Sequence, residues 1–373
     1  MSEIKGNIVV LSSHTPSLFW FRTDMMSEFL NRGYNVYALG NEAEADWASR
    51  FLEKGILYEQ IQVCRNGVNP FHDKKTLHSI KEKLRKINPV KIFTYQAKTI
   101  IYGTLAANSL GITEVYPLIA GIGSVFITDS FKSRVIRIIM TFLYRKSMKK
   151  CPLVFFQNKD DEIIFRNNRI ITNQDVKLLH GSGVNLEKFT LLPLPEKTAF
   201  LCISRLIKDK GVSEYLEACK LLKKDYPQVR CLLVGPFDSN PSALKPEDIE
   251  PYINNDIIEF FGEQEEVRPL IKQASVFVLP SYREGTPKTN LEAMACGRPI
   301  ITTDTTGCRE TVVDGENGFL VRVKDVNHIY QKMKFFVDNP EIIARMGQCG
   351  RKMTEEIFDV NKVNEEICKS MRI

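Results

Sequence analysis

The sequence predicts an α/β protein made of two doubly wound, Rossmann-like domains, each with a parallel sheet covered by helices. Short β-rich runs alternate with amphipathic stretches in each half of the chain, and the alternation restarts after a proline-rich stretch near the middle. The 373 residues are enough for two cores of ordinary size. With 43% hydrophobic and 26% charged residues, the composition is that of a globular protein.

The expected elements follow in chain order. In the first half, strands are expected at residues 7–11, 35–39, 91–95, 115–119 and 153–157, and helices include residues 18–31 and 74–87. In the second half, strands are expected at residues 199–204, 228–234, 257–261, 276–279 and 300–303. Two prolines interrupt residues 191–196, so the predicted domains are 1–192 and 193–373. Ligands of two facing sheets are expected in the interdomain cleft, beyond the carboxyl ends of the strands.

Composition narrows the function classes. No apolar run approaches the roughly 20 residues that span a bilayer, and the N-terminus has no secretory signal, so we expect a cytoplasmic protein. The nine cysteines are scattered and lack a C-x-x-C spacing, which favours reduced thiols over disulfides or a zinc site. The formal charge is +6, with positive residues clustered in the first half. We expect no nucleic acid partner, because no reader motif accompanies these residues.

The loop after the first expected strand, residues 12–17, carries serines and a histidine instead of G-x-G-x-x-G. That sequence removes the close backbone approach that a nicotinamide or flavin cofactor needs. The loop offers hydroxyls and backbone donors at a helix start, with Ser17 as the expected N-cap. Helix capping alone also explains the polar residues of this loop.

Two cations follow the first expected strand of the second half. Arg205 and Lys210 lie after the strand end and before a helix. The arginine fork and the mobile lysine charge together suit a departing nucleotide diphosphate, with no metal required. Alone, this spacing also fits a solvated basic turn.

Residues 279–299 read as strand, glycine loop, helix and strand. Glu284 in the loop can accept hydrogen bonds from sugar hydroxyls, and the N–H groups from Gly285 onward face an anion at the helix start. Glu292 lies about two turns along the helix, where a carboxylate can hold a ribose diol. The alternative is a charged helix start in front of a buried helix.

The E-x7-E pattern from Glu284 to Glu292, with Arg205 and Lys210 upstream, resembles the family 4 retaining glycosyltransferases of the GT-B fold. The resemblance implies that Glu284 contacts the transferred sugar, and that Glu292 contacts the ribose. It assigns Arg205 and Lys210 to the diphosphate and implies no metal or other cofactor. Further donor contacts are implied for Gly285, Thr286, Pro287, Lys288, Thr289, Asn290 and Leu291.

The similarity extends over nearly the whole chain. His14 and residues 21–22, 121–124, 182–189 and 238–242 resemble a bacterial subgroup that adds N-acetylgalactosamine to undecaprenyl-diphosphate-linked diacetylbacillosamine. This resemblance implies a UDP-sugar donor and a polyprenyl-diphosphate-linked glycan acceptor. It favours UDP-GalNAc or UDP-Gal as the donor. The candidates for contacting the acceptor or its phosphates are His14, Arg22, Gly121 and Gly123.

The sequence also departs from the family pattern. Many members carry a histidine or an acidic residue where residues 120–123 read Ala-Gly-Ile-Gly, so we assign no side-chain base. In retaining members the leaving phosphate oxygen is thought to take the acceptor proton. His14 has two possible roles, contact with sugar or phosphate and a purely structural one, because a lone histidine is often structural.

Two stretches of the first half combine cations with apolar residues. Residues 74–86 are rich in lysine, and residues 131–146 mix cations with a wide apolar face. Such helices favour peripheral docking at the inner face of the cell membrane. The alternative is a pair of core helices with solvated basic edges. The resemblance also implies a last helix, at about residues 353–371, that packs back on the N-terminal domain.

Two other functions fit the same architecture. A UDP-sugar 2-epimerase needs acid and base residues in the cleft, and none can be identified from the sequence. A catalytically silent sugar-nucleotide-binding protein is the second, and the presence of all four motif residues argues against it.

Overall fold

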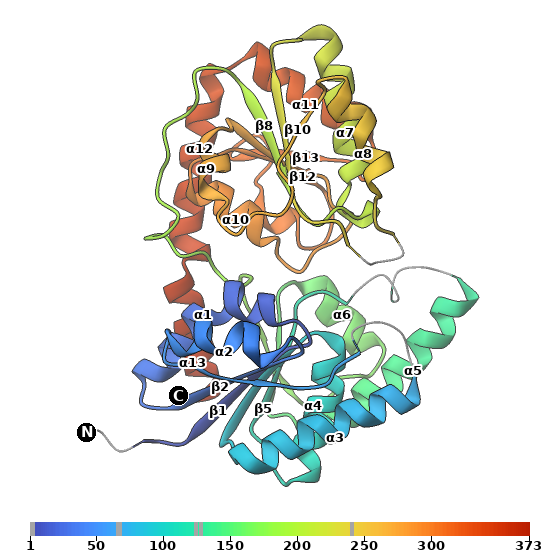
Figure 1. Ribbon diagram of the computed structural model, residues 1–373, viewed down its shortest axis with the longest axis vertical. Helices are drawn as coiled ribbons and strands as arrows, with labels where there is room; N and C mark the ends of the chain where they lie inside the picture. The colour runs from blue at the N-terminus through green and yellow to red at the C-terminus, as the bar shows by residue number, and fades with distance from the viewer. Residues whose placement is uncertain (1–3, 65–68, 123–125, 127–129, 239–241) are drawn as a thin grey trace. The chain divides into compact units, whose positions relative to one another are not determined.

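The computed structural model describes residues 4–64, 69–122, 126, 130–238 and 242–373. The chain divides into two compact units (Figure 1). Unit 1 consists of Met1–Ser182 with Val360–Ile373, and unit 2 consists of Gly183–Asp359. Each unit has its own parallel sheet and its own core.

Unit 1 contains a seven-stranded sheet in the order β3-β2-β1-β4-β5-β6-β7, with all pairs parallel. The strands are β1 (Asn7–Leu11), β2 (Asn35–Gly40), β3 (Leu57–Gln60), β4 (Lys91–Tyr95), β5 (Val115–Ile119), β6 (Leu153–Phe156) and β7 (Asp175–Leu178). The helices are α1 (Thr15–Asn31), α2 (Glu44–Leu52), α3 (Pro70–Ile87), α4 (Ala97–Ser109), α5 (Phe131–Met148), α6 (Lys159–Asn167) and α13 (Val360–Met371).

Both faces of this sheet are buried. Val9 and Leu11 of β1 join a core with α3, α4, α5 and α6, whereas Ile8 and Val10 join a second core with α1, α2 and α13. Successive residues of a strand point to opposite faces, so a strand covered on both sides reads as a continuous apolar run. The strand order reverses between β1 and β4, which makes their carboxyl ends the expected ligand position.

Unit 2 contains a six-stranded parallel sheet in the order β10-β9-β8-β11-β12-β13, so its switch point lies between β8 and β11. The strands are β8 (Ala199–Ile203), β9 (Arg230–Val234), β10 (Glu259–Phe260), β11 (Val276–Leu279), β12 (Ile300–Thr303) and β13 (Gly318–Val321). The helices are α7 (Val212–Asp225), α8 (Pro246–Asn254), α9 (Arg268–Lys272), α10 (Lys288–Ala295), α11 (Val326–Asp338) and α12 (Glu341–Met353). The predicted class, two doubly wound parallel α/β sheets, is confirmed.

Three strands escaped the sequence prediction. β3, β7 and β13 are four residues long, and each lies at the edge of its sheet. β3 and β7 carry mostly exposed or half-buried residues. Because β3 and β7 are covered less completely, they lack the apolar run that marks a central strand. β13 is apolar and mostly buried, so its place at the edge does not explain why it was missed.

The division between the units falls at Ser182 and Gly183 instead of at residues 192 and 193. Arg298, which is 1% exposed, holds the proline-rich stretch in unit 2. Its guanidinium donates to the carbonyl oxygens of Leu192 (2.9 Å), Pro193 (2.7 Å), Cys296 (2.9 Å) and Ile271 (3.1 Å). The prolines therefore interrupt the strand and helix pattern at a place where the backbone is hydrogen-bonded to the rest of unit 2, and not at a domain boundary.

The C-terminal segment differs from one helix at 353–371. α12 ends at Met353, a π-helical turn η4 (Thr354–Phe358) follows, and α13 begins at Val360. Ile367, Cys368 and Met371 of α13 are buried in the unit 1 core that also contains α1. Arg32 of α1 hydrogen-bonds to Glu365 and to the carbonyl of Ile373 (3.0 Å), so polar contacts also hold α13 in unit 1.

Candidate active site

The loop after β8 lies directly against the end of β11 in unit 2. Gly211 has φ +71°, and an added Cβ would lie 2.1 Å from the Pro280 carbonyl oxygen. The carbonyl oxygen of Asp209 accepts hydrogen bonds from Tyr282 N (2.8 Å) and Ser281 Oγ (3.2 Å). These contacts join the short helix η2 (Lys208–Lys210) to the loop that carries Glu284.

Lys210 and Glu284 form the central pair of this site. Lys210 Nζ is hydrogen-bonded to Glu284 Oε1, and the two side chains are 21% and 13% exposed. The Glu284 amide donates to the Thr306 carbonyl at 3.0 Å. An added Cβ at Gly307 would lie 2.3 Å from the Glu284 carbonyl oxygen, so only glycine allows this approach. The structure thus brings together two residues that are far apart in the sequence.

Arg205 follows the same strand but has a different partner. Its Nη1 lies 2.8 Å from Asp238 Oδ2, and its side chain is 46% exposed. Arg205 is thus the more open of the two predicted cations. Asp238 precedes residues 239–241, which lie outside the described part of the chain.

The predicted donor-binding residues 285–292 run from the glycine loop into α10. The N-cap residue of α10 is Pro287, and no side chain caps the helix start. First-turn N–H groups and the helix dipole favour an anion there. Gly285 and Pro287 are buried, whereas Thr286 and Thr289 are half-buried.

Three other residues of α10 use their side chains within unit 2. Lys288 Nζ donates to the Gly183 carbonyl at 2.8 Å, and Asn290 Nδ2 donates to Thr311 Oγ1 at 2.9 Å. Leu291 is buried in the core. The backbone amides of Asn290 and Leu291 donate to the Pro287 carbonyl at 3.1 Å and 3.4 Å, so the implied donor contacts of these two residues stay a prediction.

Glu292 has a different electrostatic environment from Glu284. Burial raises the pKa of Glu292 to about 7, while Lys288 and Lys188 act to lower it and Glu266 to raise it. The residue keeps some exposed surface, yet the neighbouring apolar groups make desolvation the largest effect. A carboxyl with this pKa changes charge near neutral pH.

The acceptor candidates lie in unit 1. His14 is the half-buried N-cap residue of α1, without a side-chain capping hydrogen bond, and exposed Gly121 follows β5 with φ +103°. Gly123 lies outside the described residues. The expectation that Ser17 caps α1 is wrong. The helix begins at Thr15, and Ser17 Oγ instead donates to the His14 carbonyl at 2.8 Å.

Arg22 is a buried cation at the start of unit 1. It is 3% exposed, and its guanidinium carbon lies 5.2 Å from the centre of the Tyr95 ring and 5.7 Å from that of Phe93. Among the described residues its Nε has no hydrogen-bond partner. Burial lowers the pKa of the guanidinium, and Tyr95 opposes the shift. Such a charge is costly to bury alone.

Gln96, which the sequence did not single out, organises the loop after β1. Its Oε1 accepts hydrogen bonds from Ser12 Oγ (2.9 Å), Ser13 N (3.0 Å) and Ser13 Oγ (2.6 Å). Its φ of +68° is unusual for a residue with a side chain. Gln96 directly follows β4, so this strained residue and the serine loop meet at the β1/β4 switch point. A glutamine gives no local sequence signal for such a position.

Comparison with known proteins identifies the part of the chain that carries the motif residues. Residues 185–353 match the family model of glycosyl transferases group 1. We call this matched segment the group 1 domain. The group 1 domain contains Arg205, Lys210, Glu284 and Glu292, and it lies within unit 2.

Relatives extend the similarity beyond the group 1 domain. The chain is 26% identical over 346 residues to the N,N'-diacetylbacillosaminyl-diphospho-undecaprenol alpha-1,3-N-acetylgalactosaminyltransferase of Campylobacter jejuni, covering 89% of each protein. It is 24% identical over 319 residues to an Escherichia coli UDP-Gal:alpha-D-GlcNAc-diphosphoundecaprenol alpha-1,3-galactosyltransferase, covering 81% of this chain and 80% of the relative. The resemblance to this kind of transferase is confirmed.

Solved structures share the fold. The Anabaena HepE structure superposes with a TM-score of 0.77 at 16% identity, covering 98% of this chain and 99% of HepE. This confirms the GT-B fold predicted from the motifs. None of the helices in the described part of the chain is long and apolar enough to cross a membrane.

Proposed function

We propose that this protein is a retaining glycosyltransferase that moves a hexose or N-acetylhexosamine from a UDP-sugar to an undecaprenyl-diphosphate-linked saccharide in bacterial cell-surface glycan assembly. Galactose and N-acetylgalactosamine are the best candidates for the sugar. The observation that carries the proposal is the Lys210–Glu284 pair at the β8/β11 switch point of the group 1 domain. The names of the two relatives support it, since both include an undecaprenol-diphosphate-linked acceptor and one includes UDP-Gal.

In the proposed reaction, Lys210 and Arg205 neutralise the departing diphosphate. The bond between the sugar C1 and the β-phosphate oxygen breaks, and a bond from C1 to the acceptor oxygen forms on the same face. The acceptor hydroxyl proton passes to the leaving phosphate oxygen, so no side-chain base is used. Two fixed cations suit this role because the negative charge develops on the leaving group. We propose that the reaction requires no metal.

The donor is held by residues on either side of this pair. Glu284 accepts hydrogen bonds from the transferred sugar, and its pairing with Lys210 keeps both groups in place before the donor arrives. The main chain from Gly285 to Leu291 faces the diphosphate, where the uncapped start of α10 favours an anion. Glu292 accepts from the ribose hydroxyls.

The acceptor diphosphate is the proposed counter-ion of Arg22. A buried guanidinium whose Nε has no hydrogen-bond partner among the described residues is a binding position for an anion that arrives with a ligand. Gln96 positions the neighbouring serine loop, and His14 and Gly121 lie at the carboxyl ends of strands in the same sheet. Gly123 remains a candidate from the sequence alone. Because such an acceptor is lipid-linked, we propose that unit 1 associates peripherally with the inner face of the cell membrane.

A product assay tests the proposal. The full chain is incubated with a panel of UDP-sugars and short-prenyl diphosphate saccharides, with and without EDTA, and UDP release and product mass are followed. We expect one UDP-sugar to give a glycosylated acceptor, the same rate in EDTA, and an α linkage by NMR. UDP release without a glycosylated product contradicts the transferase. A β linkage contradicts retention, and a new UDP-sugar formed without acceptor indicates an epimerase.

A further inference from the structure

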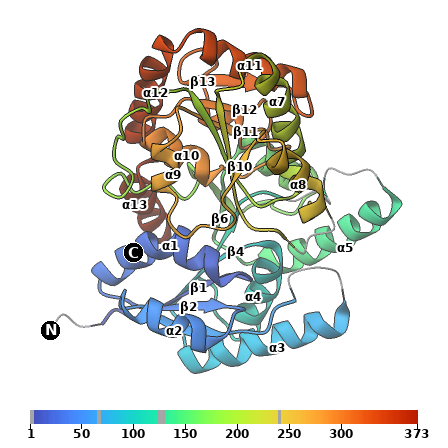
Figure 2. The ribbon, with the colours of Figure 1, turned by 45° about the horizontal axis from the view of Figure 1, so that its top comes forward.

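An exposed apolar face runs along α5 in unit 1. Its members are Phe131 (84% exposed), Val135 (42%), Ile138 (70%), Ile139 (41%) and Phe142 (63%). Their spacing places them on one side of the helix. The opposite side is buried through residues that include Tyr144 and Met148. One end of α5 extends beyond the neighbouring elements of unit 1 in both ribbon views (Figures 1 and 2).

Charges along α5 have one sign. Every charged residue from 131 to 150 is lysine or arginine. Arg134, Arg145 and Lys146 are exposed and lie on the same side as the apolar face. Arg145 Nε donates to the Asn168 carbonyl at 3.0 Å, which holds this cation close to the body of unit 1. The surface therefore combines protruding apolar side chains with cations at both ends.

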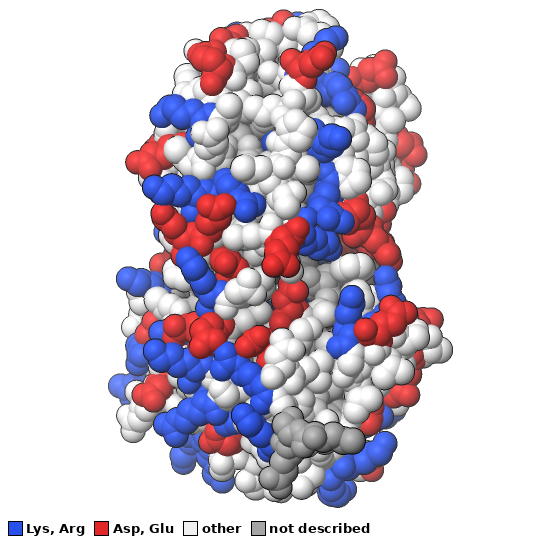
Figure 3. Space-filling view, turned by 90° about the vertical axis from the view of Figure 1, so that its left-hand side faces the viewer, with Lys and Arg blue, Asp and Glu red and all other residues white. Residues whose placement is uncertain are grey.

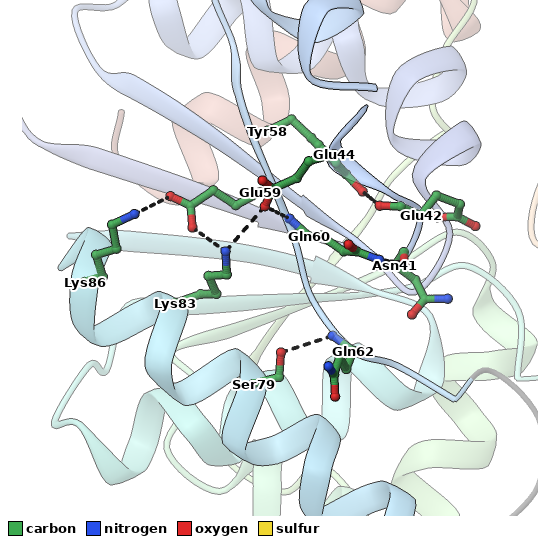
Figure 4. A network of polar contacts seen from close by, with 10 residues as sticks. All are labelled: Asn41, Glu42, Glu44, Tyr58, Glu59, Gln60, Gln62, Ser79, Lys83 and Lys86. Atoms are coloured by element: carbon green, nitrogen blue, oxygen red, sulfur yellow. Dashed lines mark hydrogen bonds and ion pairs between the residues drawn. The ribbon is translucent and has the colours of Figure 1, made fainter. Parts of the chain in front are cut away.

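α3, the other basic stretch predicted for docking, is built differently. Its apolar residues Ile80, Leu84 and Ile87 are buried in the core, whereas Phe71 in its first turn is 81% exposed. Lys83 pairs with Glu59 (2.9 Å) and Glu44 (3.5 Å), as Figure 4 shows. α3 is thus a core helix whose basic side is partly neutralised by unit 1 itself.

Basic residues on one other face of the protein are mixed with acidic ones. The face drawn in Figure 3, seen from the left of Figure 1, carries Lys and Arg side chains among Asp and Glu side chains. Such a surface gives an anionic partner no uniform attraction. This contrast leaves α5 as the stronger docking surface.

We propose that the exposed side of α5 docks on an anionic lipid bilayer, with its apolar face at the boundary of headgroups and acyl chains and its cations against lipid phosphates. The inference rests on the proposed function, because a lipid-linked acceptor brings the reaction to a bilayer. A bilayer surface matches both features at once, since it offers an apolar layer directly beneath a layer of negative charge. The helix lies in the interface and does not cross it.

Vesicle sedimentation of the full chain tests the docking surface. We expect sedimentation with vesicles of phosphatidylcholine and phosphatidylglycerol, and much less with phosphatidylcholine alone. The double substitution Ile138→Glu with Phe142→Glu should lower partitioning about tenfold, because two acids replace two inserted side chains. Arg134→Gln with Lys146→Gln should weaken binding to the anionic vesicles only.

A matched control keeps this experiment interpretable. Leu52 of α2 is 62% exposed in the same unit, and Leu52→Glu should change partitioning less than about twofold. Thermal unfolding and UDP affinity should match wild type in every variant, which shows that they are folded. Equal partitioning of the α5 variant and the control overturns the proposal. So does a wild-type chain that self-associates through this face without binding vesicles.

This test and the test of the proposed function fail independently. Vesicle binding needs no catalysis, so a chain that binds vesicles but forms no product loses only the proposed function. A chain that glycosylates a short-prenyl acceptor but does not bind anionic vesicles loses the α5 inference and the proposed membrane association, and keeps the proposed transferase activity.

Discussion

The two units hold their candidate cations in opposite ways. In unit 2, Lys210 pairs with Glu284 and Arg205 pairs with Asp238, and all four side chains keep some exposure. In unit 1, Arg22 is buried against Tyr95 and Phe93, and its Nε has no hydrogen-bond partner among the described residues. A paired, accessible cation can share its charge with an incoming phosphate while it keeps its place. A buried lone cation is held by packing and gains its first strong partner only from a ligand.

The largest effect on turnover is expected at the Lys210–Glu284 pair. Lys210→Ala should lower kcat about a hundredfold, because a fixed positive charge at the leaving group acts mainly in the transition state. KM for the UDP-sugar should change much less. Lys208→Ala, an exposed lysine in the same short helix, is the control and should leave kcat near wild type. Unchanged turnover in the Lys210 variant would remove Lys210 from the reaction and weaken the contrast between the units.

Replacing Arg22 is expected to weaken acceptor binding without lowering the stability of the fold. Arg22→Met should raise KM for the acceptor about tenfold by removing a charged hydrogen-bond donor. Its free energy of unfolding should stay within about 1 kcal/mol of wild type or increase, because a buried lone charge is lost.

The matched control is Arg32, the C-cap residue of the same helix, which bonds to Glu28, Glu365 and the Ile373 carbonyl. Arg32→Met should lower stability by about 1 kcal/mol without changing acceptor KM. If the Arg22 variant loses stability and keeps the wild-type acceptor KM, Arg22 has a structural role and does not bind the acceptor.

A smaller effect is expected on the UDP-sugar affinity from Glu292, which forms no ion pair within the described part of unit 2. Because the ionised form accepts from the ribose diol, UDP-sugar affinity should increase as pH rises through the pKa of about 7. We expect a rise of about fivefold between pH 6 and pH 8 in wild type. Calorimetry with Glu292→Gln should show weaker binding and no such rise. The same slope in the variant would assign the pH dependence to another group.

The sequence predicted that Lys210 and Glu284 lie together, and the structure confirms this pairing. Glu284 lies in a short glycine loop and Lys210 follows a strand that the apolar pattern reveals, so the signal for each residue is local. Gln96 lies in a stretch without a motif and becomes notable only when β4 is placed beside β1. Pairing of Arg205 with Asp238 also depends on the fold.

The fold shows the same limit. Central strands were predicted because both faces are buried, whereas the poorly covered edge strands β3 and β7 were missed. The prolines near residue 193 interrupt the pattern as expected. What fastens them to unit 2 is Arg298, more than a hundred positions along the chain, and no local pattern indicates that contact.

Unit 1 is discontinuous, since its helix α13 follows all of unit 2 along the chain. A ribosome therefore releases α13 only after all of unit 2 has been translated. Until then the apolar side of α1, which includes Met25, Met26 and Phe29, lacks part of its final cover. A polypeptide truncated anywhere in the group 1 domain leaves that surface of α1 open to proteases and chaperones. Quality control can therefore recognise an incomplete chain by the exposed apolar side of α1.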